Sequence, residues 1–183
     1  KPFHVIADHF ARHGIASLRY DDRGVAESSG DFSEATSLDL ANDAEAAFNF
    51  LITRDDLNNA ELGICGHSEG GLLAPLIAAR NDSVDFIILM AAPGVDGQQI
   101  ILSQGPLLMR AQGISEPDIT KQNKIQEVVL SIIRNNQQND EALISVKLQH
   151  ALGSDDPGIT QTIKTLQASV KKQATPWLRT FLS

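Results

Sequence analysis

The pentapeptide Gly66-His67-Ser68-Glu69-Gly70 lies between two apolar segments and decides how the chain around it folds. Residues 62–65 form a short continuous apolar run before it, and residues 72–79 form a longer apolar run after it. A short apolar run next to turn residues is typical of a buried strand, whereas the longer run is typical of a helix. The sequence therefore predicts a strand, a tight glycine-flanked turn that carries Ser68, and a helix.

A serine at such a strand–turn–helix junction is typical of a catalytic nucleophile. The turn is strained, and it projects the serine hydroxyl from the edge of the sheet. Gly66 and Gly70 carry no side chains, which allows the strand and the helix to pack closely around Ser68. The backbone N–H of Glu69 would then face a developing oxyanion at the N-terminus of the helix. The alternative is a glycine-rich turn in which Ser68 only caps the helix.

The composition is that of an ordinary globular protein. Of the 183 residues, 42% are hydrophobic and 21% are charged, which suffices for one domain with a packed core. The net charge of −8 argues against nucleic acid and anionic membrane surfaces as partners. No apolar run is long enough for a membrane span, and the composition fits the bacterial cytoplasm and the periplasm equally. Cys65 is the single cysteine and sits in the apolar strand, where we expect a buried, inert thiol.

Two helices and a strand are expected before the strand that leads to Ser68. Residues 3–13 have one apolar face, and the glycine after them is the expected end of that helix. Residues 15–20 are expected to form a strand. Residues 36–54 have the clearest helical pattern, and Thr36 with Asp39 resembles a capping box at its start.

Residues 84–91 are expected to form another continuous apolar strand, after the helix that follows Ser68. The run 86–89 does not alternate with polar residues, which suits a strand covered on both faces. Helices and strands thus alternate through this half of the chain. The alternation predicts a parallel sheet with right-handed crossovers, so the expected fold class is α/β.

The second half is expected to be a helical module with no strand of its own. The apolar run at residues 100–111 contains Gly105-Pro106, which should kink or split a helix. Further helical segments are expected at residues 117–133, 141–152, 160–172 and 176–182. The sequence thus divides into residues 1–97, which contain the sheet, and residues 98–183, which contain only helices.

A polar loop follows the first expected strand. It contains Asp21, Asp22, Arg23 and Gly24, with Ser28 shortly after them. In open α/β sheets, ligands bind at the carboxyl ends of the strands, where this loop would lie. The favoured interpretation is structural, with an Asp–Arg pair that fixes the loop rather than residues that act directly in catalysis.

With these motifs the chain resembles the α/β-hydrolase superfamily, and most of all its cap-bearing bacterial esterases and serine-peptidase-like hydrolases. The matching residues are Arg19 to Gly24 with Ser28, Gly66 to Gly71, and Ala91 to Gly94. The resemblance identifies residues 1–97 as the N-terminal part of an incomplete hydrolase core and residues 98–183 as a helical cap or lid, with the C-terminal core strands absent. Ala26 is a departure, because family members often have a second glycine there.

The resemblance implies that Ser68 is the nucleophile, that the Glu69 N–H is one oxyanion donor, and that Gly66 and Gly70 are the elbow glycines. In this superfamily the acid and the histidine of the triad follow the serine in sequence. They lie after later strands, so the resemblance implies that the triad acid and base are not in this chain and that it is part of a longer hydrolase. Because a triad acts as a unit, we expect little activity from these residues alone.

Other titratable residues are weaker candidates. His150 lies on an expected cap helix, where a surface or partly packed histidine is favoured over a catalytic base. Asp155 and Asp156 lie in a polar turn with no strand to present them. His9 and His13 share a helix face but have no third ligand in view, so no metal site is expected.

Two elbow residues have side chains with expected structural roles. The side chain of His67 is expected to point away from the nucleophile and to pack. The Glu69 carboxylate is expected to complement the helix dipole rather than to act as a catalytic acid.

The expected function is that of a serine hydrolase without a cofactor or metal. Ser68 would attack a carboxylic ester, thioester or amide and form an acyl-enzyme. The helical half is rich in Ile, Leu and Met, which favours an apolar group on a small ester or peptide-like substrate. A serine peptidase or acyltransferase of the same fold is the alternative, and a non-catalytic binding domain is another. An exposed edge of the parallel sheet could also join two copies into a homo-oligomer.

Overall fold

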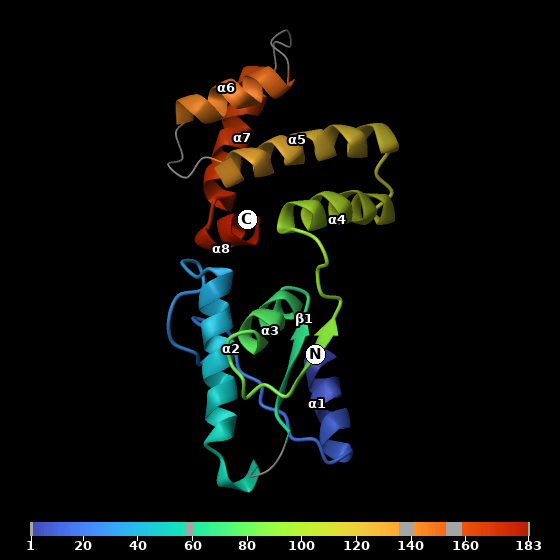
Figure 1. The fold of residues 1–183 in the computed structure, drawn as a ribbon. Helices are drawn as coiled ribbons and strands as arrows, with labels where there is room; N and C mark the ends of the chain where they lie inside the picture. The colour runs from blue at the N-terminus through green and yellow to red at the C-terminus, as the bar shows by residue number, and fades with distance from the viewer. Residues whose placement is uncertain (1, 58–60, 136–140, 153–158, 183) are drawn as a thin grey trace.

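The structure is a computed structural model that describes residues 2–57, 61–135, 141–152 and 159–182. Asp155 and Asp156, the acidic residues expected in a polar turn, lie outside these ranges. Figure 1 shows two parts stacked on each other, with the strands and their flanking helices below and a group of helices above. The fold class is mixed α/β with a parallel sheet, as the sequence predicts.

The lower part contains, within the described residues, two strands and the helices around them. In chain order these elements are α1 (Pro2–Arg12), α2 (Ser37–Ile52), the short 3-10 helix η1 (Asp55–Leu57), β1 (Gly63–His67), α3 (Gly70–Ala78) and β2 (Phe86–Met90). The strands are parallel, and their register runs from Gly63 opposite Phe86 to His67 opposite Met90. α3 packs against both strands and against α2, while α1 lies beside the sheet (Figure 1).

Local sequence signals place the ends of these helices correctly. Gly14 follows α1 with a φ of +76°, a left-handed conformation that glycine adopts without strain. Thr36 caps α2, since its hydroxyl oxygen accepts the Asp39 N–H and its own N–H donates to the Asp39 carboxylate. The predicted capping box is therefore confirmed.

The predicted strand at residues 15–20 is wrong. These residues form no sheet ladder with any described segment, and Ile15 and Leu18 are exposed. A strand forms only where a neighbouring strand supplies hydrogen bonds. An apolar run indicates a tendency to form a strand but does not show whether such a neighbour is present.

Two burial predictions for the sheet are also wrong. β2 was expected to be covered on both faces, but the side chains of Phe86, Ile88 and Leu89 are exposed among the described residues. Cys65 in β1 is exposed as well, against the expectation of a buried thiol. Desolvation still raises the pKa of Cys65, which favours the protonated thiol. Burial depends on what packs over a strand, and the strand's own sequence does not contain that information.

The upper part consists of helices alone within the described residues, as predicted. They are α4 (Gly97–Ala111), α5 (Glu116–Asn135), α6 (Glu141–Leu152), α7 (Ile159–Gln173) and α8 (Pro176–Phe181). The sequence predicts a kink or a split at Gly105-Pro106, and the split does not occur, because α4 continues through Pro106 as one helix. None of the described helices is long and apolar enough to cross a membrane.

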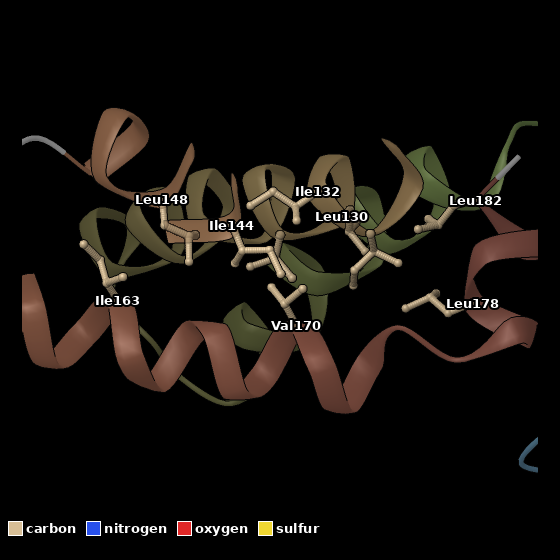
Figure 2. Close-up of a cluster of buried hydrophobic side chains, with 10 residues drawn as sticks. Leu130, Ile132, Ile144, Leu148, Ile163, Val170, Leu178 and Leu182 are labelled. Carbon is tan, nitrogen blue, oxygen red and sulfur yellow. The ribbon is translucent and has the colours of Figure 1, made fainter. Parts of the chain in front are cut away.

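Each part has its own hydrophobic cluster. The upper cluster joins α5, α6, α7 and α8 through side chains that include Leu130, Ile144, Leu148 and Val170 (Figure 2). A smaller cluster lies between α2 and α3 and includes Leu40 and Ile77. One residue, Trp177 at the start of α8, packs against both clusters and so connects the two parts.

Candidate active site

Ser68 lies in the strained turn that the sequence predicts between β1 and α3. Its φ is +54°, in the left-handed region that residues with a Cβ rarely adopt. Its N–H donates to the Met90 carbonyl at 3.0 Å, and its carbonyl accepts the Gly71 N–H at 2.8 Å. The end of β2 and the start of α3 thus hold the serine in this conformation, and Ser68 itself is exposed.

Close packing around the serine requires glycine at positions 66 and 71. A Cβ on Gly66 would collide with the backbone of Gly70 and Gly71, and a Cβ on Gly71 would collide with the Cβ of Ala92. A Cβ on Gly70, by contrast, would meet no described atom within 4 Å. The close approach expected of Gly66 and Gly70 is therefore made by Gly66 and Gly71 within the described residues.

The backbone N–H of Glu69 lies immediately after Ser68 and before the first residue of α3. The carbonyl of Glu69 already accepts hydrogen bonds from the helix, from the N–H groups of Leu72 and Leu73. No acceptor for the Glu69 N–H exists among the described residues. A donor at a helix N-terminus without an internal partner can bind an anion, as the sequence-based hypothesis for this N–H requires.

The carboxylate of Glu69 makes contacts that the sequence did not predict. It accepts the hydroxyl of Ser37 at 2.6 Å and the indole N–H of Trp177 at 2.8 and 2.9 Å. It makes no side-chain hydrogen bond to the N-terminus of α3, so it does not cap that helix. Trp177 is 108 positions further along the chain, and no local pattern in the sequence could have connected the two residues.

Arg23 fixes its loop through an ion pair, but with a different partner from those next to it in sequence. Its guanidinium binds both carboxylate oxygens of Asp43 on α2, at 2.6 and 2.7 Å, and also donates to the Asp39 carbonyl. This pairing with Asp43 raises the pKa of Arg23. The loop is closed by a bond from the Ser28 hydroxyl to the Asp21 carbonyl. The structural interpretation of this loop is confirmed, with α2 supplying the acid.

Ala26 lies in the same loop, where related proteins often have glycine. Its φ is +50°, so the backbone adopts a conformation that favours glycine even though alanine is present.

None of the histidines in the described residues forms a hydrogen bond with the serine hydroxyl. His67 is exposed and contacts the ring of Phe3 on α1, with ring centroids 5.6 Å apart. His150 is exposed on α6, and Figure 1 shows α6 at the far end of the upper part from β1 and α3.

His9 on α1 and His13, the first residue after that helix, are neighbours, and their ring centroids lie 4.3 Å apart. His13 uses its Nδ1 in a hydrogen bond with the carbonyl of His9. Within the described part of the chain, no group of three or more His, Cys, Asp or Glu residues could hold a metal ion.

An apolar groove of about 390 Å³ lies in the upper part. Its lining includes Ile101, Gln126, Leu130, Gln173, Trp177 and Leu178. Trp177 thus borders the groove and also hydrogen-bonds to Glu69, the residue after Ser68. Trp177 is therefore a direct link between the groove and the turn that carries Ser68.

Comparison with known proteins agrees with the geometry of the turn. No curated protein and no solved structure matches the chain. The model of the family described as "Serine aminopeptidase, S33" matches residues 2–178, which is nearly the whole chain. The family match agrees with the turn at Ser68 between β1 and α3 and with the parallel sheet. The chain belongs to the serine aminopeptidase S33 family, whose members are hydrolases of the α/β-hydrolase superfamily.

Proposed function

We propose that this protein is a serine hydrolase that acts on a carboxylic ester, thioester or amide through an acyl-enzyme on Ser68. The conformation of Ser68 carries the proposal, because its φ of +54° is the strain that a nucleophile elbow requires. A serine that only capped α3 would have no need of this conformation, since N-cap residues normally have extended backbones. The family assignment supports the same reaction class.

In the proposed reaction, Ser68 Oγ attacks the substrate carbonyl carbon as its proton passes to a histidine. The carbonyl oxygen becomes an oxyanion, which the Glu69 N–H stabilises. The bond to the leaving group then breaks, the histidine returns the proton to that group, and an acyl-serine remains. Water hydrolyses the acyl-serine by the same steps. We propose that the triad acid and histidine come from parts of the protein outside this chain, as the family resemblance implies.

The two parts of the fold have different roles in the proposed reaction. Residues 1–97 form the N-terminal part of the hydrolase core, and residues 98–183 form a helical cap. The groove beside Ile101, Leu130 and Leu178 supports an apolar acyl or alcohol group in the substrate. The exposed apolar surface of β2 supports the further proposal that copies associate at the sheet, and a strictly monomeric mass by light scattering would exclude it.

An aminopeptidase activity is the second candidate, because the matched family is described by that activity. The two candidates differ in the leaving group and in the need to recognise a free amine. A p-nitrophenyl butyrate assay and a leucine p-nitroanilide assay on the protein at its natural length separate them. We expect faster turnover of the ester, and loss of that turnover in Ser68→Ala. Faster turnover of the anilide would establish the peptidase, and no turnover of either would favour the non-catalytic alternative.

A further inference from the structure

The Glu69 carboxylate lies where three elements meet. Glu69 immediately precedes α3, Ser37 is the first residue of α2, and Trp177 is the second residue of α8. Both donors reach the carboxylate within 2.9 Å, and all three residues are at least partly buried. Hydrogen bonds to an ionised acceptor are stronger than those between neutral groups, especially where water is partly excluded. The carboxylate therefore ties α8 of the upper part to the elbow and to α2.

Trp177 is held in place from the side of the upper part as well. Thr175 caps α8, and the indole ring stacks on Phe181 with centroids 5.3 Å apart. Phe181 in turn lies so close to Gly97, the first residue of α4, that a Cβ there would collide with it. The position of Trp177 is thus linked by direct packing to both ends of the helical part, the start of α4 and the end of α8.

We propose that Glu69 and Trp177 form a latch that seats the helical part on the elbow, and that Trp177 is a positioning residue which acts on Ser68 through Glu69. The carboxylate and the proposed oxyanion donor belong to the same residue, so a change in the side chain's anchor moves the peptide that follows the nucleophile. The latch itself concerns only the packing of the two parts. The effect of Trp177 on Ser68 rests on the proposed function.

A purely local role for the Glu69 side chain does not account for these contacts. A carboxylate at a helix N-terminus normally caps the helix or faces solvent, and this one does neither. Trp177 is the only tryptophan of the chain, and its N–H is satisfied by this carboxylate. The indole is half-buried, and a buried Trp N–H usually finds a hydrogen-bond partner; here that partner is a carboxylate from the other part of the molecule.

Hydrogen–deuterium exchange tests the latch without any assumption about activity. Trp177→Phe removes the N–H and keeps an aromatic ring, while Glu69→Met removes the acceptor and keeps the side-chain length. We expect each variant to speed exchange in residues 176–181 by about tenfold or more, the factor expected for loss of hydrogen bonds to a charged group. Amides of residues 129–133 in the upper core should be unaffected. Glu127→Met, on the exposed side of α5, is the matched control and should leave both segments unchanged.

The double variant decides whether the two residues act through one interaction. Removing both partners leaves no unsatisfied polar group between them, so the combined effect should be smaller than the product of the two single effects. Glu69→Gln keeps an acceptor and should exchange more slowly than Glu69→Met. Unchanged exchange in the single variants, or single effects that multiply in the double variant, would overturn the latch.

The rate of labelling by a fluorophosphonate tests the effect on Ser68. In protein that labels at Ser68, we expect Trp177→Phe to slow labelling while the overall stability of the protein stays near that of the parent. Faster exchange in α8 with an unchanged labelling rate would overturn the positioning role. If the parent protein does not label at all, the proposed function fails, whereas the exchange experiment still decides the latch.

Discussion

Substitution of Gly66 by alanine perturbs the elbow at its tightest point. A Cβ on this residue would lie 2.8 Å from the Gly71 nitrogen and closer still to the carbonyl of Gly70. Real Cβ atoms essentially never lie closer than 3.0 Å to a heavy atom. All three atoms belong to the backbone at the start of α3, so no side-chain rotation relieves the collision. β1 and α3 would have to separate by about 1 Å.

The expected cost follows from that displacement. Overpacking a well-packed site lowers the unfolding free energy by roughly 1–3 kcal/mol. Because the atoms that Gly66→Ala would contact belong to the backbone and cannot rotate away, we expect a loss of about 3 kcal/mol. A domain with a stability of about 5–15 kcal/mol remains folded after such a loss. A displacement of about 1 Å at a reacting group slows the reaction by roughly a hundredfold, so labelling of Ser68 should fall by about that factor.

Urea unfolding of Gly66→Ala and Gly70→Ala measures this difference directly. Gly70→Ala is the matched control, because the same methyl group added four residues further along the chain meets no described atom within 4 Å. We expect a large drop in the unfolding free energy for Gly66→Ala and almost none for Gly70→Ala. Equal stability of Gly66→Ala and the parent would refute the packing argument, as would an equal loss in both variants.

Two further predictions concern the start of α2. Thr36→Ala removes the cap and should lower the unfolding free energy by about 1 kcal/mol in urea titrations, whereas Thr36→Ser should retain most of it. Hydrogen bonds from the Thr36 hydroxyl and N–H hold the pKa of Asp39 below its usual value. That stabilisation is complete above the ordinary aspartate pKa of about 3.9 and disappears as the pH falls through the lower folded-state pKa. Asp39→Asn should therefore lower the urea midpoint at neutral pH and have a shrinking effect below about pH 3; a constant effect across this range would contradict the assignment.

The features that could be predicted from the sequence are those determined over a few residues. The capping box of Thr36 and Asp39 and the end of α1 just before Gly14 depend on neighbours within one helical turn. The turn at Ser68 is indicated by the residues next to it, although Met90 of β2 also helps to hold it. The sequence predicts an ion pair between Arg23 and an aspartate, but it does not identify which aspartate. The partner is Asp43, which lies 20 positions away and reaches the loop only after α2 has packed.

The features that could not be predicted depend on what lies beside a segment in space. Residues 15–20 are apolar enough for a strand but have no strand beside them among the described residues. Phe86, Ile88 and Leu89 form the apolar run expected of a buried strand, yet nothing in that run shows whether another layer covers it. The contact of Glu69 with Trp177 joins the two parts of the fold and leaves no periodic signal in the sequence.

Active-site labelling tests the central claim, that Ser68 is the nucleophile of a hydrolase. The parent protein and Ser68→Ala are treated with a fluorophosphonate, both as this chain and at natural length, and the labelled peptide is identified by mass spectrometry. The account predicts a label on Ser68 at natural length, no label in Ser68→Ala, and little or none on this chain alone. A natural-length protein that stays unlabelled, or that carries its label on another residue, would contradict the account.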